Sequence, residues 1–449
     1  MSLAQRLAWF EGVSTLGIVT ATIAVSLPTG QEFTGIESVV PRVFLVVLVC
    51  TAAFYFNDLY EFERPQSFAE LFGRLCRALG WAALLLAATY LVFPTTMIPG
   101  NLASDALLIL LGTILVLRGV VYGLAKRPPF GQRVLLLGGG TLAADLARHI
   151  RTRPDLALTC VGFLGDGGLP PTEAPRLGAS SDVLDVVGRV RPDRIIVAMP
   201  DRRGQLPVAD LLACRFRGVI IEEGTQVFER FTRRLAVESL SPSTLIFGDG
   251  FRVSPAYVLL KRAMSVLIAV AALVVAAPFM AVVALLIKLE SPGPVFFVQE
   301  RVGLAGRIFR LVKFRTMREI SGTDDDIWQR DNQRRVTRLG TLLRKYRLDE
   351  IPQFINILRG DMSLVGPRPE MASNVATFSE VIPFYNLRHE VRPGLTGWAQ
   401  VKAGYSMSVE EVTQKLCFDL YYVKHMSLRF DLRILFDTVK FVLCGKRPG

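Results

Sequence analysis

The sequence has few of the residues that bind soft metals or form disulfides. Among its 449 residues there are three histidines and six cysteines, and no two cysteines form a CxxC pair. A zinc site, a disulfide framework and a histidine-rich metal site are therefore not indicated. Any metal in this protein should be a hard cation held by oxygen ligands.

Acidic residues are also in deficit, with 40 Asp and Glu against 52 Lys and Arg and a net charge of +12. The basic residues are scattered and no nucleic-acid motif appears, so we expect no nucleic-acid partner. Hydrophobic residues make up 51% of the chain, which is high for a soluble protein and indicates membrane segments. The positive excess then fits loops that face the cytoplasm and anionic lipid. The N-terminus lacks the pattern of a cleavable signal peptide.

Four apolar stretches predict a transmembrane region over residues 1–126, because each has about the length that a spanning helix needs. The loops after the first and third stretches lack Lys and Arg, whereas the second loop and the exit from the fourth stretch carry several. This alternation predicts that the N-terminus and everything after Leu124 lie in the cytoplasm. The four stretches are Leu7–Leu27, Val40–Phe56, Cys76–Phe93 and Leu107–Leu124.

Residues 131–235 show the alternating strand and helix signals of a Rossmann-like α/β module. Gly138, Gly140 and Ala143 fit the G-x-G-x-x-A pattern, which suits a phosphate at a helix N-terminus. A dinucleotide site needs an acidic residue near the end of the second strand to hold the ribose, and Asp166 is the only candidate for that role. We therefore interpret the module as structural or regulatory. We expect its first strand to begin near Arg133 and its next three strands to cover residues 160–166, 193–200 and 219–222.

An uncharged apolar run from Ser265 to Ile287 is long enough to cross a membrane, but Pro278 lies in its middle. Proline inside a helix kinks or breaks it, and the two halves would reach only about 20 Å and 14 Å. A kinked fifth span would place the rest of the chain outside the cytoplasm. A re-entrant hairpin over 261–288 would keep it inside, and the cations at both ends of the run favour this second reading. We expect a linker over 236–260 and a catalytic domain over 261–449.

The last third of the chain holds the residues with the strongest chemical signal. Asp349 and Glu350 are adjacent carboxylates that precede a short apolar helix pattern, with Pro352 in its first turn. Asp349 could be a helix N-cap, or the pair could carry chemistry. A Gly- and Pro-rich turn around Arg368 holds a guanidinium in a fixed direction, which suits a phosphate or a nucleobase. The pattern of residues 427–443 fits an interfacial helix better than a core helix.

Several motifs occur in order and together resemble the bacterial polyprenyl-phosphate hexose-1-phosphate transferases, the monotopic phosphoglycosyl transferases. The resemblance covers 261–449, and the membrane region and α/β module resemble the long form of that family. Lys402–Tyr405 resembles the branch associated with exopolysaccharide export. Two departures from the family pattern lie in the broken helix, at 263–265 and at Ala277. The motifs are Lys261-Arg262, Ser291-Pro-Gly-Pro294, Lys313-Phe-Arg-Thr-Met317, Leu348-Asp-Glu-Ile-Pro-Gln353, Leu358–Pro369 and Arg392–Val401.

The resemblance implies a transfer in two steps. Asp349 would attack the β-phosphorus of a UDP-hexose, with glucose the first expectation and galactose the second, and UMP would leave. Glu350 would assist undecaprenyl phosphate, which then accepts the sugar phosphate. Mg²⁺ is the implied cofactor, with Asp349 and Glu350 beside it. The expected substrate-binding residues are Lys313, Arg315, Arg347 and Arg368.

The fold class expected is therefore membrane α plus α/β, with four transmembrane helices, a Rossmann-like module and a mostly helical catalytic domain with a re-entrant membrane helix. The protein is expected in the bacterial inner membrane as a multi-pass protein in contact with lipid, with its catalytic domain in the cytoplasm. The sequence leaves homo-oligomerisation open. The competing interpretation is a regulatory or scaffold protein in which 131–235 binds a nucleotide. A transporter is disfavoured, because the apolar stretches hold few charges.

Overall fold

The computed structural model divides the chain into two compact units, Met1–Val227 and Phe228–Pro448, with Gly449 assigned to the first. Each unit is described by itself. The structure describes residues 36–57, 68–94, 116, 132–153, 156, 158–165, 173–199, 206–240, 245, 250–251, 253–318, 335–403 and 408–444.

Two apolar helices of the first unit correspond to two of the four predicted stretches. They are α2 (Ile36–Phe56) and α3 (Phe68–Val92), which contact each other. Residues Phe72–Val92 of α3 are long and apolar enough to cross a membrane, whereas the apolar part of α2 is the shorter Phe44–Phe56. The first predicted stretch lies outside the described residues, as does the fourth apart from Val116.

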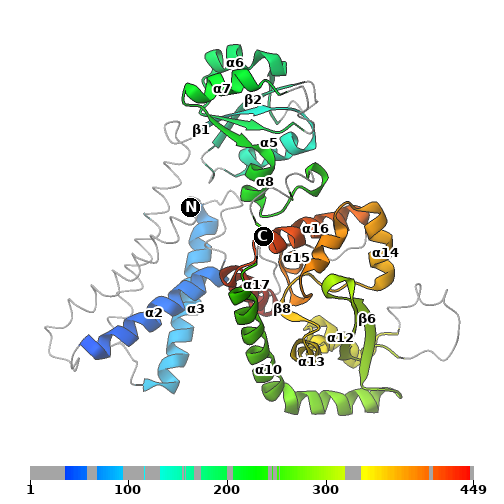
Figure 1. Cartoon of the computed structure of the whole chain (residues 1–449). Helices are drawn as coiled ribbons and strands as arrows, with labels where there is room; N and C mark the ends of the chain where they lie inside the picture. The colour runs from blue at the N-terminus through cyan, green and yellow to red at the C-terminus, as the bar shows by residue number, and fades with distance from the viewer. Residues whose placement is uncertain are drawn as a thin grey trace. The chain divides into compact units, whose positions relative to one another are not determined.

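The first unit also contains a five-stranded parallel sheet, which confirms the predicted α/β module. The strand order is β3-β2-β1-β4-β5, and every neighbouring pair is parallel. Leu135 and Leu137 of β1 contact helices α6 and α7 on one face of the sheet, while α5 covers the other (Figure 1). The elements are β1 (Gln132–Leu137), α5 (Thr141–Thr152), β2 (Leu158–Leu164), β3 (Arg176–Gly178), η5 (Ser180–Asp182), α6 (Val183–Val190), β4 (Arg194–Val197), α7 (Val208–Phe216) and β5 (Ile220–Glu223), with α8 (Gly224–Thr232) crossing into the second unit.

Packing explains the first glycine of the G-x-G-x-x-A pattern. Gly138 has a φ of +114°, and a Cβ there would lie 2.7 Å from the backbone nitrogen of Met199. Only glycine fits this approach of β1 to the chain after β4. The residue is therefore needed for the fold, and nucleotide binding by the module stays untested.

In its described residues, the second unit contains the 36-residue helix α10, two small sheets and a set of shorter helices. The β6–β7 pair is antiparallel and β8–β9 is parallel. Its elements are η6 (Val237–Ser239), α10 (Pro255–Glu290), β6 (Phe296–Val302), η7 (Leu304–Gly306), β7 (Ile308–Phe314), α12 (Arg338–Lys345), η8 (Leu348–Glu350), α13 (Gln353–Arg359), β8 (Ser363–Val365), α14 (Ala372–Val381), η9 (Tyr385–Glu390), β9 (Gly394–Thr396), α15 (Trp398–Lys402), α16 (Val409–Lys424) and α17 (Leu428–Cys444).

The long helix α10 contains Pro278 and turns sharply along its length (Figure 1). In the first half of the helix, before Pro278, Ala269 lies in a core with β8 and α17 residues. Near its end, Val283 and Ile287 pack with Phe314 of β7 and Leu343 of α12. Both halves of α10 therefore contact the same compact unit, although most of the helix surface is apolar and exposed.

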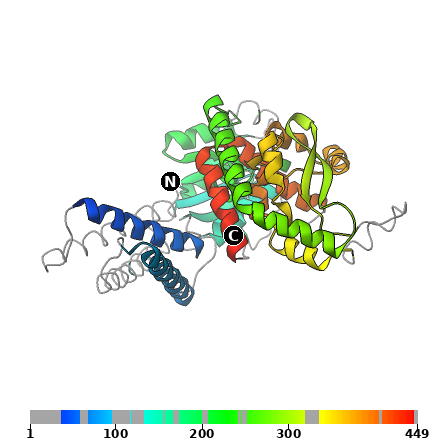
Figure 2. The ribbon, with the colours of Figure 1, turned by 90° about the horizontal axis from the view of Figure 1, so that it is seen from below.

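Polar contacts fix the start of α10 despite the departures from the family pattern nearby. Tyr257 donates to Asp431 Oδ2 at 2.8 Å, and Lys261 contacts both Tyr422 and Asp431. Arg262 donates to the carbonyl oxygens of Ile357 and Leu358 at the end of α13. Figures 1 and 2 show α17 beside this first part of α10.

Helix α17 has its polar side inward and its apolar side outward. Asp431, Asp437 and Lys440 are at most 3% exposed, together with the apolar Ile434. The opposite side exposes large apolar side chains, namely Leu432, Phe436, Val439 and Val442. This arrangement is the reverse of that on a water-soluble helix.

The segment from Phe228 to Leu240 packs on the second unit. Leu235 and Val237 are buried in a core with Leu416 and Leu420 of α16. Glu229 forms an ion pair with Lys424 and a hydrogen bond with His425. Its partners place this segment within the second unit, although it precedes α10 in sequence.

Candidate active site

Asp349 and Glu350 lie in the 3₁₀ turn η8, between helices α12 and α13. Arg347 begins this turn in the left-handed region, with a φ of +54°. Helix α13 begins at Gln353 with Pro352 as its N-cap and has no side-chain capping hydrogen bond. Asp349 is therefore not the N-cap of this helix, and its carboxylate is available for chemistry.

Helix α13, which follows the two carboxylates, is bonded to β7 by the buried side-chain amide of Asn356. Sequence patterns did not identify this residue. Asn356 is fully buried, and its Oδ1 accepts from Val312 N at 3.0 Å. Its Nδ2 donates to Arg310 O at 2.7 Å and to Asp361 Oδ2 at 3.1 Å. The amide thus bonds the backbone of β7 as a neighbouring strand would, which ties α13 to the strand that carries Lys313.

Three of the four predicted cations are close to the two carboxylates. Arg368 Nη2 lies 2.8 Å from Glu350 Oε1, and Arg347 Nη1 lies 3.8 Å from Glu350 Oε2. Lys313, on β7, interacts electrostatically with both carboxylates and with Arg368. The site therefore pairs one carboxylate with two arginines and leaves a lysine near the other.

The fourth predicted cation, Arg315, contacts a different part of the fold. It is 4% exposed, and its Nη2 donates to the carbonyl and hydroxyl oxygens of Ser291 at 2.7 Å and 2.9 Å. Ser291 ends α10, so these contacts fix the end of the long helix to β7. The structure shows no contact of Arg315 with Asp349 or Glu350 among its hydrogen bonds, and a substrate-binding role for it stays a prediction.

Burial and charge shift two pKa values in opposite directions. Burial, followed by the Glu350 carboxylate, raises the pKa of Asp349 above its ordinary value, while Lys313 and Arg344 act against this rise. Burial, followed by Arg301, lowers the pKa of Lys313. A desolvated carboxylate beside a cation of reduced pKa is an arrangement typical of reactive sites.

The donors available for a cation are few and hard. In the described part of the chain, no group of three or more His, Cys, Asp or Glu side chains is placed to hold a metal ion. Asp349 and Glu350 offer carboxylate oxygens, and Mg²⁺ commonly binds proteins through one or two carboxylates while phosphates and water complete its shell. The donor set therefore fits Mg²⁺ bound together with a phosphate substrate.

Comparison with known proteins places the second unit in a family. Residues 256–445 match the family described as bacterial sugar transferase. The chain is 42% identical over 260 residues to a UDP-N-acetylgalactosamine-undecaprenyl-phosphate N-acetylgalactosaminephosphotransferase of Aeromonas hydrophila, covering 58% of this chain and 61% of that protein. It is also 42% identical over 323 residues to a UDP-glucose:undecaprenyl-phosphate glucose-1-phosphate transferase of Escherichia coli, covering 71% and 69%.

A shorter relative matches this chain over almost its whole length. An exopolysaccharide production protein of Rhizobium leguminosarum is 42% identical over 189 residues, which is 40% of this chain and 93% of that protein. By contrast, the chain spans only about three fifths of the length of the Aeromonas relative.

Proposed function

Because this chain belongs to the bacterial sugar transferase family of polyprenyl-phosphate hexose-1-phosphate transferases, we propose that it transfers a hexose 1-phosphate from a UDP-sugar to undecaprenyl phosphate. The observation that carries this proposal is the buried Asp349, which lies beside Glu350 and close to the charge of Lys313, while Arg347 and Arg368 contact Glu350. The names of the relatives support the substrate classes, and that of the Rhizobium relative supports a role in exopolysaccharide synthesis.

The proposed reaction has two displacements at one phosphorus. In the first, an Asp349 oxygen forms a bond to the β-phosphorus, and the bond to the bridging oxygen breaks, so that UMP leaves with the electron pair. In the second, an oxygen of undecaprenyl phosphate attacks the same phosphorus and displaces Asp349. Covalent catalysis of this kind replaces one difficult step by two easier ones.

The surrounding charges suit this chemistry. Burial deprives the Asp349 carboxylate of water, which makes it a stronger nucleophile. Lys313 and Arg368 can offset the negative charge of the transferring phosphate, as fixed cations do in phosphoryl transfer. Glu350 is paired with two arginines and is proposed to assist the acceptor. Mg²⁺ bound by Asp349, Glu350 and the substrate phosphates would neutralise further charge.

We further propose that α10 enters the membrane and returns to the same side. Its start is bonded to α17 and α13 and its end packs on β7 and α12, whereas a spanning helix would separate its ends by the thickness of a bilayer. The outward apolar side of α17 would lie at the same interface. In this arrangement the active site faces the cytoplasm beside the lipid that carries the acceptor.

Loss of Asp349 tests the reaction. In membranes that contain the Asp349→Asn variant, release of UMP from UDP-sugar should fall by at least about 10³-fold, as is usual when a nucleophile is removed. Asp185→Asn, at an exposed position on α6, is the matched control and should leave the rate unchanged. Unchanged UMP release by the Asp349 variant would exclude the proposed function.

The identity of the sugar requires a separate experiment. The Aeromonas relative is named for an N-acetylgalactosamine donor and the Escherichia relative for a glucose donor, and glucose is our first expectation with galactose second. Membranes should be incubated with radiolabelled UDP-glucose, UDP-galactose and UDP-N-acetylgalactosamine in parallel. Label from the true donor should enter the organic-soluble lipid at least about tenfold faster than the others, since a site that bonds sugar hydroxyls discriminates strongly.

A further inference from the structure

Arg368 lies in the turn Pro367–Glu370, and each of the four carbonyl groups of this turn accepts a hydrogen bond. Pro367 O accepts from Gly394 N at 2.9 Å, and Glu370 O accepts from Val302 N at 2.9 Å. Between them, Arg368 O accepts from Arg388 Nη2 at 3.0 Å, and Pro369 O accepts from Arg301 Nη1 at 3.2 Å. Four successive carbonyls thus bond to four donors from different segments of the chain.

This turn cannot fix itself. Pro367 and Pro369 have no N–H, so the backbone offers few donors with which to close a turn of its own. Proline limits φ but leaves ψ to be set by outside contacts. The direction of the Arg368 side chain, which meets Glu350 at 2.8 Å, therefore depends on the groups that hold its carbonyls.

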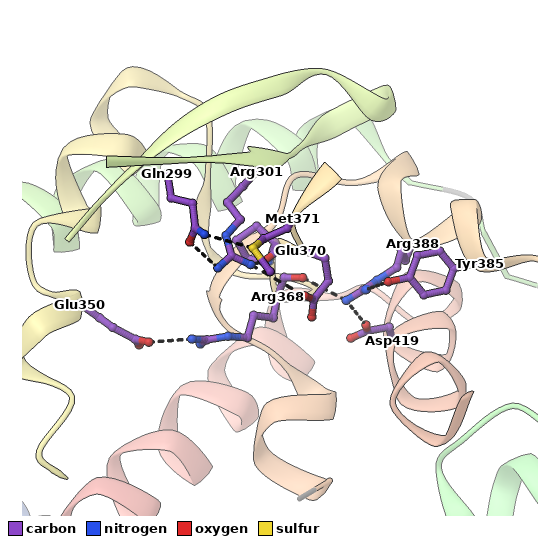
Figure 3. A network of polar contacts seen from close by, with 10 residues as sticks. Gln299, Arg301, Glu350, Arg368, Glu370, Met371, Tyr385, Arg388 and Asp419 are labelled. Carbon is purple, nitrogen blue, oxygen red and sulfur yellow. Dashed lines mark hydrogen bonds and ion pairs between the residues drawn. The ribbon is translucent and has the colours of Figure 1, made fainter. Parts of the chain in front are cut away.

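Arg388 contacts three other residues of this network, Tyr385, Asp419 and Arg368 (Figure 3). It is 6% exposed and lies in η9. Its Nη2 also donates to Asp419 Oδ2 at 2.8 Å, and its Nη1 donates to Tyr385 OH at 2.8 Å. Asp419, on α16, is 2% exposed and Tyr385 is 2% exposed. The guanidinium thus has one fixed position, from which it reaches Arg368 O.

The cost of burying this pair suggests that it serves more than stability. A buried ion pair seldom stabilises a protein more than apolar residues of the same volume would. Burial raises the pKa of Asp419 to about 6, even though Arg388 acts in the opposite direction. The pair places a rigid donor at the carbonyl of Arg368, the residue whose side chain contacts Glu350.

We propose that Arg388, held by Asp419, is a positioning residue that sets the Arg368 guanidinium against Glu350 through the Arg368 carbonyl. Arg301 acts in the same way from β6, through the Pro369 carbonyl. Neither residue touches the reacting phosphorus in this scheme. The inference rests on the proposed transferase function, because the effect that it predicts is on that reaction.

A double-mutant cycle tests whether Arg388 acts through Arg368. The pair should be neutralised together, as Arg388→Gln with Asp419→Asn, because either charge left alone would be buried without its partner. We expect this neutral pair to lower kcat for UMP release about 10- to 100-fold with a KM for UDP-sugar within about threefold of the wild type, as small misplacement of a catalytic group does. In an Arg368→Ala background, the same neutral pair should lower the remaining kcat by less than about threefold.

Additive losses in the two backgrounds would overturn the proposal, since they would show that the pair acts independently of Arg368. Thermal unfolding of each variant measures any general loss of stability, and if the neutral pair does not fold, Arg388→Lys enters the same cycle. Arg194→Gln, which breaks an ion pair in the sheet of the first unit, is the matched control and should leave kcat unchanged. Absence of UMP release by the wild type would instead refute the proposed function itself.

Discussion

The two carboxylates of η8 are neighbours in sequence but have different surroundings. Asp349 is 9% exposed, and burial raises its pKa. Glu350 contacts Arg368 and Arg347 through separate oxygens. A carboxylate without a close ion pair is the better nucleophile, whereas one held by two arginines keeps a fixed position. These surroundings support the proposed roles, with Asp349 as nucleophile and Glu350 as its helper.

The pH dependence of UMP release should report the surroundings of Asp349. The reaction needs the ionised carboxylate, so a raised pKa makes activity fall, on acidification, at a higher pH than for an ordinary aspartate. Lys313→Gln removes a charge that lowers the pKa of Asp349, and the acid limb should move to higher pH. Glu350→Gln removes a charge that raises this pKa, and the limb should move to lower pH.

Single-turnover rates measured across pH give the position of the limb independently of the absolute rate in each variant. Arg189→Gln, on the exposed side of α6, should leave the limb in place. Shifts in the same direction for Lys313→Gln and Glu350→Gln would contradict the electrostatic account.

At the scale of single residues, the sequence was most informative where chemistry and local pattern coincide. The adjacent acids beside Pro352 identify the candidate site, and Lys313, Arg347 and Arg368 lie around it as expected. Arg315 instead binds Ser291, because a strand pattern gives the side of the strand but not which partner lies there. Sequence patterns did not identify Asn356, Arg388 and Asp419, because the structural role of each depends on a hydrogen-bond partner far away in sequence.

At the scale of elements, the position of α13 depends on one buried amide. Replacing Asn356 with Ala would leave Val312 N and Arg310 O without their partner, at a cost of about 1–3 kcal/mol for each buried group. We expect Asn356→Ala to lower the free energy of unfolding by about 2–5 kcal/mol and to lower the rate of UMP release as well.

Asn356→Asp separates the two bonds, because it keeps the acceptor for Val312 N and removes the donor to Arg310 O. It should be less stable than the wild type, and it also places a charge near Asp361. Chemical denaturation measures both variants. Wild-type stability in Asn356→Ala would show that the amide does not hold α13.

Labelling from outside the cell can distinguish a re-entrant α10 from one that spans the membrane. If α10 returns to the cytoplasmic side, the exposed position Glu410 on α16 lies inside the cell. In a chain whose native cysteines have been replaced, Glu410→Cys should therefore resist a membrane-impermeant maleimide applied to intact cells. Asn101→Cys, in a loop predicted to face outward, is the control that should be labelled.

Labelling of Glu410→Cys from outside would show that α10 spans the membrane. A sequence pattern alone leaves the kinked span and the re-entrant helix open, since both share the same apolar run and the same proline. The packing of Ala269 and Ile287 on one unit is the information that the pattern lacks.

At the scale of the whole molecule, the catalytic unit begins earlier than its family match. The match starts at residue 256, yet the second unit includes Phe228–Leu240. This segment buries Leu235 and Val237, and Arg233 O accepts from the indole nitrogen of Trp398 at 2.9 Å. Sequence patterns did not predict this packing, because a short segment without strong periodicity gives no sign of what it will cover.

A shortened chain that begins at Gly224 should therefore differ from one that begins at Leu245. Among the side chains that the second lacks are Leu235 and Val237, which pack with α16 and are worth about 3–6 kcal/mol together, and Glu229. We expect the chain from Gly224 to retain UMP release in membranes and the chain from Leu245 to unfold at a lower temperature. Equal unfolding temperatures would show that Phe228–Leu240 adds nothing to the catalytic unit.

In the proposed reaction, Asp349 forms a covalent bond to the sugar phosphate before the lipid acceptor reacts. Purified enzyme should be mixed with UDP-glucose in the absence of undecaprenyl phosphate, quenched, digested and analysed by mass spectrometry. We predict that the peptide containing Asp349 gains the mass of one hexose phosphate as UMP is released, and that added undecaprenyl phosphate removes it. UMP release only in the presence of undecaprenyl phosphate, with no modified peptide, would contradict the account.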